Sequence, residues 1–146
     1  MTAYLSTELG STANQTAAPT GYKPTATVYQ ARLKRLRASF TYASQAITDT
    51  LTIGILPAGA TFAYGVLNAD TSSGSTTIAI GITGTTAKYK AAAAFTATDT
   101  PTFFGKTAPV VASPLSAEEQ VIVTLAAATA PSSGNLCVDI FYSLPN

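Results

Sequence analysis

Histidine and tryptophan are absent from this chain of 146 residues, and cysteine occurs once. Without imidazole, the chain lacks the usual general base at neutral pH and the Ser-His-Asp and Cys-His arrangements that activate a nucleophile. The single cysteine, Cys137, excludes an intrachain disulfide and a zinc site built on several thiolates. The missing tryptophan removes the side chain that stacks best on sugars and bases. These absences predict a protein that is not an enzyme and that uses no metal or cofactor.

Charge is also scarce. Charged residues make up 10% of the chain, whereas about 25% is usual for globular domains. Eight basic against seven acidic side chains give a net charge of +1, so self-repulsion does little to keep copies apart. The carboxylates are scattered, with no spacing typical of a metal site or a glycosidase pair. We therefore expect a protein that lies packed against other subunits.

Targeting signals are not expected. The N-terminus has neither the basic segment nor the apolar run of a secretory signal, which predicts maturation in a host cytoplasm. The uncharged stretch 50–69 is nominally long enough to cross a bilayer as a helix. It contains Gly54, Pro57 and Gly59, and its apolar residues alternate, which is typical of strands and turns. We expect no membrane association.

Residues 1–24 are rich in Thr and Ala, are interrupted by Gly and Pro, and show no sustained periodicity. They predict an extended N-terminal arm that precedes a β domain over residues 25–146. Tyr4, Leu5 and Leu9 are apolar anchors on this arm. Two interpretations stay open: a disordered tail, as chain termini often are, and an arm that becomes ordered against a neighbouring subunit.

The rest of the chain shows repeated short alternations of apolar and polar residues separated by turn signals. The clearest apolar series are Leu51-Ile53-Ile55, Ile78-Ile80-Ile82, Val121-Val123-Leu125 and Leu136-Val138-Ile140. Seven or eight strands with turns about every 8–15 residues are typical of an all-β domain. We predict a single antiparallel β-sandwich or barrel, jelly-roll-like.

Three local predictions concern the connections. The segment 83–107 is expected to be a long loop that crosses from one sheet to the other. Within it, Ala91–Ala94 is the only stretch that favours a helical turn. Residues 108–112 are expected to be a short extended piece.

One cluster holds four of the eight basic residues within six positions, and we call it the basic strip: Arg32, Lys34, Arg35 and Arg37. As a helix, this segment would align Leu33, Leu36 and Phe40 on one face. As a strand, it would place Arg32 and Lys34 on one face and Arg35 and Arg37 on the other. The flanking β-formers favour the strand.

Three interpretations of the basic strip remain open. Its charges could guard the edge of a sheet against unwanted strand pairing. The strip could instead bind an acidic surface of a protein partner. Nucleic-acid binding is the least favoured, because the rest of the chain adds almost no positive charge and the pI is 7.8.

Three segments in sequence order carry a family resemblance: Asp49–Ala60, then Ile78–Gly84 followed by Ala87–Ala94, and finally Val138–Tyr142. In this order they resemble small structural proteins of tailed bacteriophages, in particular head decoration or cement proteins. The resemblance spans roughly residues 25–146. It implies a jelly-roll-like domain that binds the outside of an assembled capsid, often as a trimer, with no catalytic residues.

Residues and resemblance together predict a virion protein, assembled in the host cytoplasm, that binds the assembled head and stabilises it. Its expected partners are the major capsid protein or other virion subunits and further copies of itself, with a trimer favoured. The expected partner-binding residues are Tyr4, Leu5, Leu9, Arg32, Lys34, Arg35 and Arg37. The alternative is a tail or fibre module that binds a receptor or glycan, which the missing tryptophan disfavours.

Overall fold

The chain forms eight β-strands and one short helix in the computed structural model, which describes residues 32–111 and 114–144. The elements in chain order are β1 (Leu33–Thr41), β2 (Thr50–Leu56), β3 (Thr61–Ala69), β4 (Thr77–Ile82), β5 (Thr85–Ala94), β6 (Thr102–Phe104), α1 (Thr107–Val111), β7 (Glu119–Ala126) and β8 (Asn135–Ser143).

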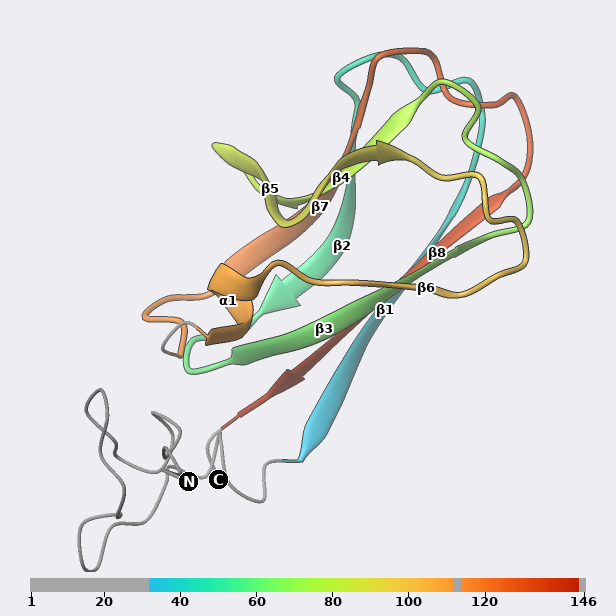
Figure 1. Cartoon of the computed structure of the whole chain (residues 1–146). Coiled ribbons are helices and arrows are strands. Elements are labelled where there is room, and N and C mark those ends of the chain that lie inside the picture. The colour runs from blue at the N-terminus through green and yellow to red at the C-terminus, as the bar shows by residue number, and fades with distance from the viewer. Residues whose placement is uncertain (1–31, 112–113, 145–146) are drawn as a thin grey trace, which may run out of the picture.

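The strands pack as two four-stranded antiparallel sheets (Figure 1). Sheet A has the order β1-β8-β3-β6, and sheet B has the order β2-β7-β4-β5. Within these orders β1 pairs with β8, β2 with β7, β3 with β6, and β4 with β5. The first strand of the chain thus pairs with the last, the second with the second-last, and so on to the two middle strands. This nesting is that of a long hairpin wound across two sheets, the arrangement of a jelly roll. The predicted jelly-roll-like sandwich is confirmed.

The core lies between the two sheets and follows from the period-2 alternation of the strands. Sheet A contributes the inward side chains Leu136, Val138 and Ile140, which are fully buried. Sheet B contributes Ile78 and Ile80 of β4 and Val121, Val123 and Leu125 of β7, which are also fully buried, whereas Ile82 at the end of β4 is partly buried. Burial of one such side chain stabilises the fold by about 1.5–3 kcal/mol. The predicted alternation of these strands therefore forms the core that holds the sheets together.

Of the local predictions for the connections, the crossing from one sheet to the other within 83–107 is confirmed, whereas the long loop, the helical turn at Ala91–Ala94 and the extended piece at 108–112 are wrong. Ala91–Ala94 belongs to strand β5, and the segment 83–107 contains β5 in sheet B and β6 in sheet A. The crossing between the sheets occurs in the short stretch between these two strands. Alanine favours helices in isolation, but here the pairing of β5 with β4 determines its conformation. The helical turn lies instead at Thr107–Val111, within the stretch that was expected to be extended.

Asp70 ties the end of β3 to the start of β8. One carboxylate oxygen accepts a hydrogen bond from the backbone N–H of Asn135 at 2.7 Å, and the other accepts one from the Asn135 side-chain amide at 2.7 Å. These hydrogen bonds favour the ionised form, so they lower the pKa of Asp70. The loops at this end of sheet A are therefore held by a charged group.

Asp70→Asn should weaken the acid sensitivity of the fold. Because the folded-state pKa of Asp70 is lowered, its contribution is complete above the unfolded pKa of about 3.9. That contribution is lost as the pH falls through the lower folded value. Urea midpoints measured at pH 5 and pH 2 should differ less in the variant than in the wild type. Asp99→Asn, whose side chain forms no hydrogen bond within the described residues, should leave the wild-type difference unchanged.

Gly65 and Phe104 form a close pair that holds the short strand β6 on sheet A. The two residues are direct cross-strand partners. A Cβ atom on Gly65 would lie 2.1 Å from Cζ of the Phe104 ring, so the ring occupies the space that any larger side chain would need. Glycine at this position is a packing requirement of the core.

Gly65→Ala should destabilise the domain by about 1–3 kcal/mol, the range typical of overpacked cores. In a Phe104→Leu background the same change should cost clearly less, because the obstructing ring is gone. Urea denaturation of the wild type, both single variants and the double variant measures this coupling. Strictly additive effects would show that Phe104 does not restrict position 65.

Candidate functional site

The basic strip forms the start of an edge strand, β1, in sheet A. The predicted strand is confirmed, and the alternative helix is wrong. Leu36 and Phe40 on the inner face pack against the core. Arg35 and Arg37 project from the outer face, with half of each side chain exposed. Strand alternation has thus separated the strip into two faces, as expected.

Asp139 of β8 fixes the orientation of Arg37. The two residues are direct partners in the β1–β8 register. Arg37 Nε donates to one carboxylate oxygen at 2.7 Å and Nη2 donates to the other at 2.6 Å, which is a bidentate pair. The Asp139 side chain is only 9% exposed. The hydrogen bonds and charge of Asp139 raise the pKa of Arg37, so this guanidinium stays charged, and the bidentate pair sets its orientation.

The other three cations of the basic strip are less constrained. The Arg35 Nε lies 3.9 Å from Asp139, beyond hydrogen-bond distance. Arg32 and Lys34 are exposed and have no ion-pair or hydrogen-bond partner among the described residues. Asp139 is the only carboxylate within 4 Å of these four cations in the described part of the chain, which leaves a local excess of positive charge on a protein whose net charge is +1.

An aromatic group lies beside these cations on the same face of sheet A. Phe141 on β8 is the cross-strand partner of both Arg35 and Tyr64. The Tyr64 and Phe141 rings stack with centroids 4.7 Å apart. The ring centroid of Phe103 on β6 lies 5.7 Å from that of Tyr64, and Phe103 is 72% exposed. Three rings from three strands thus form one cluster next to the guanidinium groups.

We call this surface the outer face of sheet A, and it comprises Leu33, Arg35, Arg37, Tyr64, Val66, Phe103, Asp139 and Phe141. The solvent side of an antiparallel sandwich is normally polar. Here the part of the face near Arg35 and Arg37 carries exposed or partly exposed aromatic and aliphatic side chains, while Ser39, Asn68 and Cys137 continue the same face beyond Asp139. Arginine and aromatic residues are the types enriched at protein interfaces and at their energetic centres. The geometry therefore favours contact with another protein.

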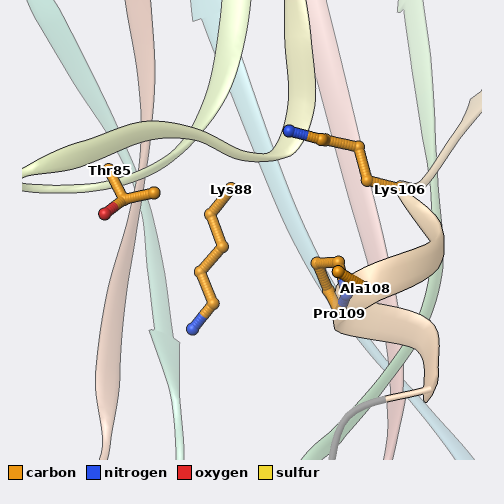
Figure 2. Close-up of a pocket in the computed structure, with 5 residues that line it drawn as sticks. All are labelled: Thr85, Lys88, Lys106, Ala108 and Pro109. Carbon is orange, nitrogen blue, oxygen red and sulfur yellow. The ribbon is translucent and has the colours of Figure 1, made fainter.

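A second candidate site is a surface pocket of about 360 Å³ beside α1, lined by Thr85, Lys88, Lys106, Ala108 and Pro109 (Figure 2). Both lysines already have partners. Lys88 pairs with Glu119, and the Lys106 ammonium donates to the backbone carbonyl of Ala87 at 3.2 Å. Figure 2 shows the two ammonium groups pointing in different directions. The pocket therefore offers no converging set of charges for an anion.

Glu119 has a structural role behind this pocket. It accepts hydrogen bonds from Lys88 and from the hydroxyl of Tyr89, the latter at 2.7 Å. The Tyr89 ring is buried and contacts Phe62 of sheet A, with centroids 4.6 Å apart. Burial and the neighbouring carboxylate raise the pKa of Tyr89, so the phenol stays protonated. This network joins the two sheets.

The remaining predictions have different outcomes. Tyr4, Leu5, Leu9 and the arm 1–24 lie outside the described residues, so their role stays a prediction, as does the boundary at residue 25. Across residues 32–111 and 114–144, no group of His, Cys, Asp and Glu side chains could hold a metal ion. In the same part of the chain, no helix is long and apolar enough to cross a membrane.

The fold is similar to chains in two solved phage capsids. A chain of the Ralstonia phage GP4 capsid is 18% identical, with a TM-score of 0.63, and the match covers 79% of this chain and 86% of that one. A chain of the cyanophage Pam1 capsid asymmetric unit is 22% identical, with a TM-score of 0.64, and the match covers 92% and 97%. No protein-family model and no curated protein sequence matches. The likeness shows a shared fold, and it agrees with the resemblance to phage structural proteins found in the sequence.

The cations of the outer face are visible in the sequence as one local cluster, whereas its aromatic cluster is not. By simple alternation along the sequence, Phe62, Tyr64 and Val66 would share one face of a strand. A register irregularity between Phe62 and Tyr64 instead places Phe62 in the core and Tyr64 outside. The position of Phe141, two residues after Asp139 on the outward series of β8, was the signal available for the cluster.

Arg37→Ala should destabilise the domain more than Arg35→Ala. Removal of Arg37 leaves the nearly buried Asp139 carboxylate without the two hydrogen bonds that the guanidinium donates. Arg35 donates no hydrogen bond to this carboxylate, because its Nε lies 3.9 Å from the nearer oxygen. The double variant Arg37→Ala/Asp139→Asn should recover part of the loss, because the buried charge is also removed. Urea midpoints of the four proteins measure this. Equal midpoints for both arginine variants would contradict the proposed role of the bidentate pair.

Proposed function

We propose that the protein is a non-enzymatic virion protein, a cement or decoration protein that binds the outside of the assembled phage head and stabilises it. The observation that carries the proposal is the jelly roll that this chain shares with chains of phage capsids, over 92% of its length in the broader match. A fold alone does not define a function. The proposal therefore also draws on the composition and on the outer face of sheet A.

Composition supports an assembly role over catalysis. The chain has no histidine, one cysteine and a net charge of +1, so it has few groups for catalysis and little charge to oppose close packing. The outer face of sheet A adds exposed rings and guanidinium groups, which suit a protein interface. We infer that its partners are the major capsid protein or other virion subunits.

The basic strip is the proposed electrostatic part of the contact, with Arg35 and Arg37 on the outer face of sheet A and Arg32 and Lys34 at the edge formed by β1. Exposed single ion pairs contribute only about 0–1 kcal/mol, but desolvated arginine contacts in an interface can contribute about 2 kcal/mol or more. Three of its four cations lack a close carboxylate partner within the described residues. They would match an acidic surface on a neighbouring subunit. Because β1 is an edge strand, the same charges also discourage unwanted strand pairing.

We further propose a homotrimer in which the arm 1–24 reaches a neighbouring subunit through Tyr4, Leu5 and Leu9. The trimer follows from the family resemblance, and closed symmetric oligomers are common among soluble proteins. Many copies on one shell would multiply modest contacts through avidity. Light scattering on the purified protein should give three times the chain mass of 14.9 kDa.

The location is tested directly on virions. Mass spectrometry of purified particles from the source phage should detect the chain, and electron microscopy should place it on the outer surface of the head. Absence from the particles would refute the virion role. A location on the tail or fibre would refute the cement role and support the receptor-binding alternative.

Phe103→Ser should weaken attachment to heads that lack the protein while leaving the urea midpoint close to that of the wild type. Phe103 is 72% exposed on the outer face of sheet A, so it contributes little to the isolated fold. Ile55→Ser is the matched control, because Ile55 is 53% exposed on an edge strand of sheet B. Co-sedimentation with particles from a phage lacking this coding sequence measures both. Equal attachment of the two variants would remove the outer face from the interface.

A further inference from the structure

We infer that the outer face of sheet A is the docking site for residues 4–9 of a second copy of this chain. The inference deepens the proposed homo-oligomer and rests on it: a second copy is the subunit that covers this face, and attachment to the head depends on the face through the assembled oligomer. The inference does not depend on a location in the virion. It assigns a position to the predicted arm anchors, and it explains why one face of the sandwich carries rings.

The outer face of sheet A exposes apolar side chains to solvent in the isolated domain. Phe103 is 72% exposed and Leu33 is 53% exposed, and between them lie Tyr64, Val66 and Phe141, all partly exposed. The stacked pair Tyr64–Phe141 and the tilted pair Tyr64–Phe103 form a continuous surface of rings. Such a patch on a solvated sheet is typical of a surface that is buried in an assembly. The described part of the chain places nothing over it.

The N-terminal arm has the matching chemistry. The segment 4–9 reads Tyr-Leu-Ser-Thr-Glu-Leu, with three apolar anchors around one carboxylate. Glu8 is the only acidic residue before Asp49. On the outer face, Arg37 is occupied by Asp139, but Arg35 lies 3.9 Å from that carboxylate and is half exposed. Arg35 is thus a ready donor for Glu8, while the rings of the face receive Tyr4, Leu5 and Leu9.

The length of the connecting segment allows this contact between copies. Residues 10–31 separate Leu9 from Arg32, where the described chain begins at the start of β1. At about 3.3–3.6 Å per extended residue, this segment spans up to roughly 70–80 Å. That reach extends well beyond a single domain of this size, whose radius of gyration is about 15 Å. Mutual exchange of arms would give each face one arm and close the oligomer.

Photo-cross-linking of the full chain tests the contact. Tyr4 is replaced by p-benzoylphenylalanine, and copies labelled with ¹⁵N are refolded together with unlabelled copies. After irradiation, mass spectrometry should find residue 4 joined to peptides that contain Phe103 or Phe141. About half of the cross-linked pairs should combine a labelled with an unlabelled peptide, as random exchange between identical copies predicts.

Charge-reversal variants test the pairing of Glu8 with Arg35. Glu8→Arg and Arg35→Glu should each lower the yield of these cross-links by about fivefold, the upper range for one exposed ion pair. The double variant should restore the yield. Lys34→Glu is the matched control: it makes the same charge change on β1, but Lys34 lies on the opposite face of the strand. This control should leave the yield unchanged, and urea midpoints confirm that every variant is folded.

Three results would overturn the inference: cross-links only within one isotope label, which would place the arm on its own domain; cross-links to sheet B or none at all; or an equal loss in Lys34→Glu and Arg35→Glu. Because the experiment uses free protein, it can fail while the protein still binds heads. Conversely, the cross-links can form even if the chain is absent from virions. Failure of this inference and failure of the proposed function are therefore distinguishable.

Discussion

The pairing of the first strand with the last is the constraint on which the rest of the structure depends. The β1–β8 register runs without interruption from Leu33 opposite Ser143 to Thr41 opposite Asn135. It places Arg37 opposite Asp139 and aligns the inner residues of β1 with the core. Because side chains alternate with a period of two, a slip of one residue would turn the arginines inward and the apolar residues outward. The core and the charged face are thus set by one register.

The same register gives the two arginines on the outer face of sheet A different surroundings. Asp139 holds one guanidinium in a fixed orientation, so the neighbouring Arg35 sits beside a rigid group and beside the ring of Phe141. Rigid aromatic and arginine side chains lose little conformational freedom when a partner covers them. In this way a nearly neutral protein presents a preorganised surface of rings and guanidinium groups.

Alternation and composition predicted most of the fold. The apolar series of β4, β7 and β8 could be located because each strand buries one face along most of its length. Ala91–Ala94 could not be assigned, because its helix propensity is overridden by pairing with β4, which only the tertiary structure reveals. The same limit applies to the site: the basic strip is visible as a local charge cluster. The aromatic group, in contrast, assembles from three strands, and a register irregularity near Tyr64 reverses the simple alternation.

The nested strand order also has a consequence for how the chain is made. Because β1 and β8 are separated by nearly the whole domain, sheet A cannot close until the ribosome has released the last strand. Contacts between such distant segments are slow to form. During synthesis, β1 therefore has both edges unpaired until β8 is available. Unpaired strand edges allow nascent chains to associate with one another. The concentration of positive charge on this strand gives the unfinished polypeptide mutual repulsion during that interval.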